Sequence, residues 1–396
     1  MATERGRSRI GRLWELLWSD GRGWVLLAVS VGWALTIGAR IVYPALLPAI
    51  RAEFGFGYTT AGVLVGLVWA AYGALQLPGG ILADTTSHRT ALVVGTVLTA
   101  VGIVAVVGAP LFGLLVLATV VMGAGTGIYG PSRVAVLSNT YPDNGSTAIG
   151  VSQAAGNLGN AILPVAAGVL TVYAGWRAGL GYLVVGLAVS ALALWMAVPV
   201  PSPTGQSTAT VRELLARTRT ALRSRPVYYG TGLLLLLMFV YQSLTGFLPT
   251  YFVDEKGLSP ETAATLYGGF FAAAVVFQLG AGPLADRFGI QRVVALSAAA
   301  SLPGFALVLV ADGLGVLVAG TVLLGCLLGC FPPAHAYTVG VVPSPIQGTG
   351  YGAIRTVYIG CGAAGPVVTG VVAEFVSFPV AVGGLGVLVA GIVLVG

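Results

Sequence analysis

Charged side chains are scarce in this sequence. Asp, Glu, Lys and Arg together make up 8% of the 396 residues, whereas 57% of the residues are hydrophobic. A water-soluble domain carries about 25% charged residues because its surface must be hydrated. A chain so poor in charge must meet lipid over most of its surface, so the composition predicts a protein embedded in a bilayer.

Chemically reactive groups are also few. The three cysteines lie in apolar runs and predict no disulfide framework; Cys326 and Cys330 share a helix face, and we interpret them as packing residues. We find no metal-ligand cluster, no ATP-binding loop and no nucleophile–base–acid set, so we expect no enzyme activity, no cofactor and no metal. The net charge of +6 is not gathered on one face, which argues against nucleic acid as a partner.

Long apolar runs fill the rest of the chain. A run of about 20 such residues crosses a bilayer as a helix, because only intrahelical hydrogen bonds satisfy the backbone there. The runs predict an all-α membrane protein with twelve spans, at 25–49, 60–82, 90–109, 111–137, 148–173, 176–197, 228–252, 261–284, 292–311, 313–341, 349–373 and 378–396. We divide the chain into an amphipathic segment 1–24, a six-helix bundle 25–198, a linker 199–226 and a second six-helix bundle 227–396.

The basic residues between the spans predict the orientation. Cytoplasmic loops of membrane proteins are enriched in Lys and Arg. With the N-terminus inside, the other side holds only Arg51, Arg177 and Lys256, and the cytoplasmic side holds Arg5, Arg7, Arg9, Arg12, Arg22, Arg89, Arg212, Arg217, Arg219, Arg223, Arg225, Arg287 and Arg292. We therefore expect a multi-pass protein of the cell membrane with both termini in the cytoplasm.

The two halves of the sequence repeat each other. A shift of 202 residues places Gln76 to Asp84 on Gln278 to Asp286, and the same shift pairs Pro131 with Pro333 and Pro164 with Pro366. One offset that holds over most of a half indicates two bundles of the same fold and direction. Parallel repeats of this kind place a substrate site between the halves, near the middle of the membrane.

The loops after the second and eighth spans carry a family motif. The second copy has Gly282, Asp286, Arg287, Gly289 and Arg292; the first keeps Gly80, Asp84 and Arg89 but has Thr85 and Ser87 where the motif has Arg and Gly. With twelve spans and a basic central loop, the chain resembles the major facilitator superfamily over essentially its whole length. The resemblance implies a transporter that works as a monomer, with the motif residues latching the halves together on the cytoplasmic side.

The subfamily is less clearly marked. Drug/proton antiporters usually have an Arg four residues before a Gly in helix 4, where this chain has Thr119, and a Gly-Pro motif where it has Gly156 to Gly159. That last stretch resembles the helix 5 of nitrate/nitrite porters, so the chain shows some likeness to nitrate/nitrite and organic-anion porters. Those porters place an Arg at the positions held here by Gln76 and Gln278, which argues against nitrate itself.

Three arginines, Arg40, Arg133 and Arg355, fall within predicted spans, and the central part of no span contains Asp or Glu. An arginine within a membrane costs about 2.5–3.5 kcal/mol and marks a functional site by default. Because the chain offers no carboxylate to pair with them, we expect the missing negative charge to belong to the substrate. A structural role, in which Arg40 and Arg355 bond to backbone carbonyls and Gln side chains, is the alternative.

The repeat pairs Arg40 with Gln242 and Arg355 with Gln153, and tyrosines lie on nearby helical positions. Guanidinium groups bind carboxylates in a bidentate manner, and amides and phenols can orient such a ligand. The predicted substrate-binding residues are Arg40, Arg355, Gln153, Gln242, Tyr43, Tyr358, Asn157, Gln76 and Gln278.

Equivalent positions in the two repeats, together with the loop motif, also predict residues for coupling and gating. His335, the repeat partner of Arg133, is the one histidine within a predicted span; it is a candidate carrier of a coupling proton, or an ordinary packing residue. Arg133 lies towards the cytoplasmic end of its helix, where it serves equally well in a gate or in ligand contact. The predicted coupling and gating residues are His335, Arg133, Asp84, Arg89, Asp286, Arg287 and Arg292.

These observations favour a secondary transporter that moves a small anionic solute by alternating access, with a site lined mainly by helices 1, 4, 5, 7, 10 and 11. Two alternatives stay open. The aromatics Trp69, Tyr72, Phe247 and Phe271 favour efflux of amphiphilic compounds. A membrane sensor that binds a ligand without moving it is also compatible with the sequence. The expected partners are a small-molecule substrate, a coupling proton or other ion, and the lipid bilayer.

Overall fold

A computed structural model describes residues 17–18, 21–199, 224–342 and 347–395. The described part of the chain is helical throughout. The helices of the first half are α2 (Arg22–Phe54), α3 (Tyr58–Ala74), α4 (Gln76–Thr85), α5 (His88–Val107), α6 (Phe112–Thr140) and α7 (Gly145–Ala197). Most of the predicted amphipathic segment 1–24 and of the linker 199–226 lies outside the described residues, so those two predictions stay predictions.

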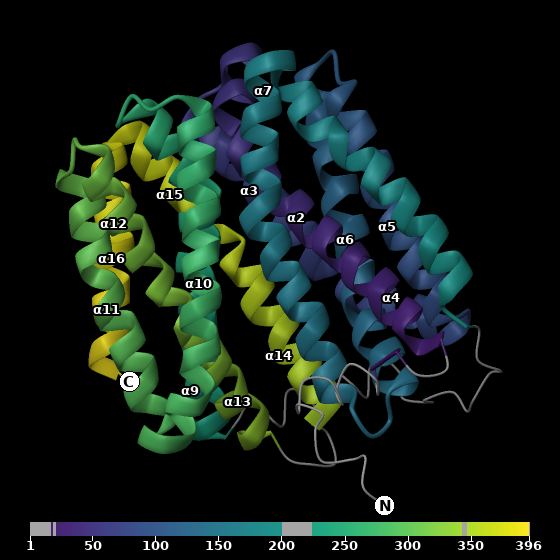
Figure 1. Ribbon diagram of the computed structural model, residues 1–396. Helices are drawn as coiled ribbons and strands as arrows, with labels where there is room; N and C mark the ends of the chain where they lie inside the picture. Colours follow the sequence, from purple (N-terminus) through teal and green to yellow (C-terminus); the bar gives the residue numbers. More distant parts are fainter. Residues whose placement is uncertain (1–16, 19–20, 200–223, 343–346, 396) are drawn as a thin grey trace, which may run out of the picture.

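The second half repeats the pattern with more interruptions. Its helices are α9 (Arg225–Asp254), α10 (Pro260–Phe288), α11 (Ile290–Val310), α12 (Leu314–Leu324), η2 (Gly325–Cys330), α13 (Phe331–Val341), α14 (Gln347–Gly362), α15 (Ala364–Phe375) and α16 (Phe378–Val395). Figure 1 shows α2 to α7, in purple to teal, gathered beside α9 to α16, in green to yellow.

The helices account for the predicted crossings. Ten helical segments in the described ranges are long and apolar enough to span a membrane, and Phe378–Leu394 is a shorter apolar one. The 53 residues of α7 would extend about 80 Å at 1.5 Å per residue, far beyond a bilayer. Its chain turns back at Gly175, whose φ of 78° and ψ of 166° are not helical. Counting α7 twice and adding α16 gives twelve crossings, and the predicted all-α membrane fold is confirmed.

Glycines bring α3 and α15 into backbone contact. A methyl group at Gly62 would collide with the carbonyl oxygen of Pro366, and a Cβ at Gly66 would lie 2.8 Å from the carbonyl oxygen of Ala363. Gly62 and Gly66 are four residues apart, on one helix face, as in the small-residue interfaces of membrane helices. Because α3 belongs to the first half and α15 to the second, this glycine face joins the halves.

Polar contacts join the halves at the same end, where α2 and α9 terminate, at the top of Figure 1. Arg51 Nη1 forms a 2.5 Å ion pair with Asp254 Oδ2, and the backbone N–H of Thr59 donates to Glu374 Oε2 at 2.6 Å. Arg51 and Thr59 come from the first half, Asp254 and Glu374 from the second. We call this end of the molecule the closed end.

The loop-motif residues lie at the opposite end. Asp84, Asp286, Arg287 and Arg292 are exposed, and within the described ranges none of them forms an ion pair. Arg89 stacks over Trp195 of its own half at 4.4 Å. The halves are thus joined by an ion pair and by close glycine contacts at the closed end, whereas the motif residues form no ion pair within the described ranges at the opposite end.

Candidate functional site

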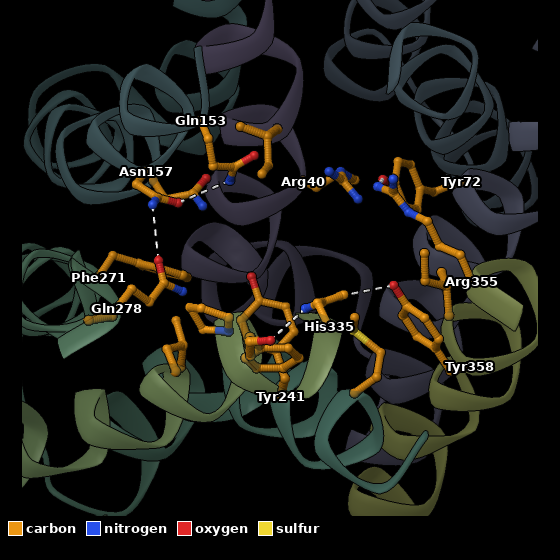
Figure 2. Close-up of a pocket in the computed structure, with 18 of the residues that line it drawn as sticks. Arg40, Tyr72, Gln153, Asn157, Tyr241, Phe271, Gln278, His335, Arg355 and Tyr358 are labelled. Carbon is orange, nitrogen blue, oxygen red and sulfur yellow. Dashed lines mark hydrogen bonds between the residues drawn. The ribbon is translucent and has the colours of Figure 1, made fainter. Parts of the chain in front are cut away.

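A cavity of about 360 Å³ lies between the two halves (Figure 2). It takes side chains from α2, α3, α6 and α7 of the first half and from α9, α10, η2, α13 and α14 of the second. Its lining residues are Trp33, Ile37, Arg40, Trp69, Tyr72, Arg133, Gln153, Asn157, Asn160, Met238, Tyr241, Phe271, Ala274, Gln278, Leu328, Phe331, Pro332, His335, Tyr351, Arg355, Tyr358 and Ile359.

Arg40 on α2 is almost fully buried, with 2% of its surface exposed. Its guanidinium carbon lies 3.7 Å from the ring centroid of Tyr72 and 4.7 Å from that of Trp69, so two aromatic faces hold the cation. Its Nε and Nη1 atoms are buried, and neither has a hydrogen-bond partner among the described residues. A buried N–H without an acceptor is costly, so Arg40 is an energetically unfavourable point in the cavity wall.

Arg355 on α14 reaches across to the first half. Its Nη2 donates to the hydroxyl oxygen of Tyr72 at 3.2 Å. Tyr72 thus contacts two cations, Arg40 through its ring face and Arg355 through its hydroxyl. We call Arg40, Tyr72 and Arg355 the arginine cluster; Figure 2 shows these three residues together on one side of the pocket.

Arg133 on α6 is held differently from the other two. Its Nη1 donates to Ser152 Oγ at 3.2 Å and its Nη2 to Gln153 Oε1 at 3.4 Å, while its guanidinium carbon lies 4.2 Å from the ring of Trp33. These partners are neutral, so Arg133 keeps its full charge in the cavity wall. Its hydrogen bonds fix the Gln153 amide.

Amide side chains line the side of the pocket opposite the arginine cluster. Gln153, Asn157 and Asn160 lie on one face of α7 because their spacing of four and three residues follows the helical repeat. Asn157 Nδ2 donates to Gln278 Oε1 on α10 at 3.0 Å, which links the halves, and Gln153 Nε2 donates to Asn157 Oδ1 at 3.5 Å. Figure 2 shows Gln153, Asn157 and Gln278 across the pocket from Tyr72 and Arg355.

His335 on α13 has a defined tautomer. Its Nδ1 lies 2.7 Å from the carbonyl oxygen of Phe331, which can only accept, so Nδ1 carries a proton. Its Nε2 lies 3.1 Å from the hydroxyl of Tyr358, which donates to it when the ring is neutral. Nε2 is therefore the atom that can take up a second proton.

Carboxylates are missing from this site. None of the residues that line the cavity within the described ranges is Asp or Glu. The ion pairs Arg51–Asp254 and Arg177–Glu53 lie near the closed end instead. No group of three or more His, Cys, Asp or Glu that could hold a metal occurs among the described residues. The cavity combines three guanidinium groups with neutral hydrogen-bonding partners.

Most of the predicted binding residues meet in this cavity, namely Arg40, Arg355, Gln153, Asn157, Gln278 and Tyr358, and so do His335 and Arg133. Three do not line it. The Tyr43 hydroxyl lies 2.8 Å from Thr119 Oγ1 inside the first half, Gln242 Nε2 donates to the Ile359 carbonyl at 3.2 Å, and Gln76 is buried beside Gly130. All three side chains are buried, and none of them is among the residues that line the cavity.

Several lining residues were not singled out from the sequence. The cavity also takes residues from α3 and α10, the second and eighth spans, which sequence reasoning left out of the main lining. Asn160 was missed although it lies one helical turn beyond Asn157, a spacing that could have found it. Trp33 and Tyr241 carry no sequence signal that separates them from the other aromatics of the spans, and Phe247, one of the aromatics named for amphiphile efflux, is buried in the core.

The family model of the Major Facilitator Superfamily matches residues 28–268 and 252–396. The chain belongs to the Major Facilitator Superfamily. It is a multi-pass membrane transporter and not an enzyme. The fosmidomycin resistance protein of Escherichia coli (strain K12) is 26% identical over 367 residues, which are 89% of this chain and 87% of that protein. An uncharacterised transporter of the superfamily from Bacillus subtilis (strain 168) is 26% identical over 354 residues, covering 87% of this chain and 85% of that protein.

The fold is shared with solved transporters. A bacterial homologue of the human lysosomal transporter Spinster, in an inward-facing and unoccupied conformation, superposes with a TM-score of 0.78 at 16% identity, over 95% of this chain and 93% of that chain. The similarity establishes the twelve-helix facilitator fold. The fold does not identify the transported solute, so the solute has to be inferred from the chemistry of the cavity.

Proposed function

We propose that this transporter carries a small organic anion. The observation that supports the proposal is the unsatisfied guanidinium of Arg40, buried beside Arg355 in a cavity whose described lining has no carboxylate. Arg40 and Arg355 come from different halves, so a phosphonate, phosphate or carboxylate placed between them would contact both. Bidentate binding of such groups is the chemistry for which guanidinium is best suited.

Alternating access follows from the two ends of the molecule. The closed end is joined by the Arg51–Asp254 pair and by the α3–α15 glycine face, whereas the loop-motif residues form no ion pair within the described part of the chain. The arginine distribution supports a cytoplasmic location for the motif end and for both termini. In this state the cavity would then communicate with the cytoplasm, and the relationship to the fosmidomycin resistance protein supports export as the direction of flux.

The test is binding and transport by purified protein in liposomes, with methylphosphonate, inorganic phosphate, sulfate and short carboxylates as substrates. Arg40→Gln and Arg355→Gln each remove a charged donor worth about 1.5–3 kcal/mol. We expect the affinity for the best anion to fall by about 10- to 150-fold. Arg40→Lys and Arg355→Lys keep the charge and should retain more of the binding.

Arg177→Gln is the matched control, because Arg177 is paired with Glu53 away from the cavity. It should bind anions with wild-type affinity. Wild-type affinity in both Arg40→Gln and Arg355→Gln would remove the anion proposal and leave these two arginines with a structural role.

Efflux of uncharged amphiphiles is the second candidate, and the aromatic lining favours it. Trp69 packs edge-on against both Tyr72 and Tyr241, with ring centroids 5.8 Å apart in each pair, and Phe271 lines the same cavity. An amphiphile exporter should protect cells from hydrophobic toxins whether or not they carry negative charge. Protection confined to anionic compounds, and lost in Arg355→Gln, would instead favour the first proposal.

We also propose that His335 carries a coupling proton at Nε2. The position of Nε2, which accepts from the Tyr358 hydroxyl in a ring that lines the cavity, supports the proposal. The test compares transport with and without an imposed pH gradient in wild type and His335→Gln. A variant that responds to the gradient as wild type does would exclude this role.

A further inference from the structure

The cavity presents two chemically different walls. The arginine cluster offers positive charge, whereas the face of α7 formed by Gln153, Asn157 and Asn160 offers neutral amides. Figure 2 shows Gln153 and Asn157 on the side of the pocket opposite Tyr72 and Arg355. A simple inorganic anion would use the first wall and leave the second without a ligand.

Two buried polar atoms on the amide side lack partners. Asn160 is 3% exposed and its Oδ1 has no hydrogen-bond donor; Trp33 is 3% exposed and its Nε1–H has no acceptor. Both residues line the cavity. An unsatisfied buried polar atom is rare in a folded protein, and a missing ligand is one of its ordinary explanations.

Asn160 lies on α7, and Trp33, which lies on α2, packs against α7 one turn earlier. A Cβ at Gly156 would lie 2.5 Å from Trp33 Nε1, so the indole nitrogen rests against α7 at that glycine. Gly156 and Asn160 are four residues apart and therefore share a helix face. An acceptor and a donor without partners thus stand about one turn apart, which complements a group with one donor and one acceptor of its own, such as a secondary amide or an N-hydroxyamide.

Resting on the anion proposal, we propose that the substrate is bipartite: an anionic head held by Arg40 and Arg355, and an uncharged amide-like tail held by Asn160 and Trp33. Gln278 and Asn157, already bonded to each other, border the tail site. Arg133 on α6 lies beside this tail site, with its guanidinium carbon 4.2 Å from the Trp33 ring, and it donates to the neutral side chains of Ser152 and Gln153.

A second anionic group at the tail site is the competing arrangement, since Arg133 Nε is buried without a partner. In its present orientation Asn160 Oδ1 favours a neutral amide, which has a hydrogen to donate to it. A carboxylate would require the Asn160 amide to turn over and present its NH2 group. The two arrangements therefore differ in which ligands they bind most tightly.

The experiment measures dissociation constants for matched ligand pairs by titration calorimetry on detergent-purified protein. The pairs are propylphosphonate with fosmidomycin, a propylphosphonate with an N-formyl-N-hydroxyamino group at its far end, and butyrate with 4-acetamidobutyrate. Phosphonoacetate and glutarate represent ligands with two acidic groups. We expect each tailed ligand to bind at least tenfold more tightly than its tail-less partner and than the doubly acidic ligands.

Two variants locate the tail. Asn160→Leu and Trp33→Phe keep the approximate shape but remove the acceptor and the donor. Each should weaken binding of the tailed ligands about tenfold and change binding of their tail-less partners less than twofold. Arg355→Gln should weaken both members of each pair. Tyr43→Phe, which removes a buried hydroxyl bonded to Thr119 inside the first half, is the control for general disturbance.

The outcomes separate this inference from the anion proposal. Equal affinities within the pairs, absence of binding by every tailed ligand, or tighter binding of the doubly acidic ligands would each overturn the bipartite substrate. Equal losses for tailed and tail-less ligands in Asn160→Leu would also overturn it. If tail-less anions still bind and still depend on Arg355 in those cases, the anion proposal stands alone.

Discussion

The charged groups at the closed end and those in the cavity are arranged in opposite ways. At the closed end, Arg51 pairs with Asp254 and Arg177 pairs with Glu53, both at 2.5 Å, and the Glu374 carboxylate accepts from the backbone of α3. In the cavity, Arg40 and Arg355 contact a tyrosine, and Arg133 contacts a serine and an amide.

The difference separates structural charges from functional ones. An ion pair at the closed end is neutralised and holds helices together. An unpaired cation buried in the cavity wall lowers the stability of the fold, and a bound anion would offset that cost. Under the anion proposal, the charges at the closed end stabilise one conformation, and the charges in the cavity bind the substrate. Four substitutions test this contrast, beginning with the largest expected effect.

Gly62→Ala should disrupt the closed end most. The added methyl group would collide with the Pro366 carbonyl, and overpacking of this kind costs about 1–3 kcal/mol. Because the collision occurs only when α3 and α15 meet, we expect transport in liposomes to fall at least tenfold while the protein remains folded. Gly150→Ala, where a Cβ has no neighbour within 4 Å, should transport at the wild-type rate. Unimpaired transport by Gly62→Ala would show that this contact is dispensable.

The substitution Gln278→Glu places a carboxylate in the cavity, where the described lining has none. At a separation of about 10 Å and an effective dielectric of about 20, the new charge would oppose a bound anion by about 1.7 kcal/mol. We expect an affinity loss of about 15-fold, measured by calorimetry. Gln278→Met, which is uncharged, should leave the affinity of tail-less anions within twofold. An anion that binds Gln278→Glu as tightly as wild type would argue against a positively charged site.

The substitution Asp254→Asn removes the ion pair with Arg51 that links the halves at the closed end. An ion pair this exposed contributes about 0.2–1 kcal/mol, so a small decrease in melting temperature is expected in low salt. The decrease should shrink in 1 M salt, where surface charges are screened. Glu53→Gln breaks a pair within the first half and should lower stability without altering the exchange between states. A salt-independent effect of Asp254→Asn would contradict the electrostatic origin.

Asp286→Asn should have the smallest effect on this conformation. The side chain is exposed and unpaired in the described structure, so the melting temperature should change by less than the equivalent of about 0.5 kcal/mol. Transport should nevertheless slow, because the opposite state would use this motif residue as a latch. A large loss of thermal stability would show that the latch is already made.

Much of the fold could be read from the residues. The apolar runs located the spans, and the offset of 202 residues paired Gln76 with Gln278 and Arg133 with His335. Symmetry, however, does not place equivalent residues in equivalent environments. Gln278 lines the cavity while Gln76 is buried near Gly130, and Arg40 lines it while Gln242 bonds to the Ile359 carbonyl.

The site was only partly predictable for the same reason. Arg40, Arg355 and Arg133 could be named because an arginine within a span is conspicuous. Tyr72, which contacts both Arg40 and Arg355, and Asn160, whose acceptor is unsatisfied, are ordinary residues in their spans. Their importance depends on neighbours from other helices.

The sequence by itself determined that the protein lies in a bilayer, how many times it crosses that bilayer, and which polar groups occur within the spans. Composition and the length of the apolar runs decide these properties, because only long apolar helices are stable in the hydrocarbon core. Tertiary structure decided which polar groups are satisfied. The Tyr43 hydroxyl meets Thr119 Oγ1, whereas Arg40 Nε, Trp33 Nε1 and Asn160 Oδ1 have no partner within the described structure. That distinction arises only when helices far apart in the chain are brought together, since a hydrogen bond depends on a few tenths of an ångström that no sequence pattern carries.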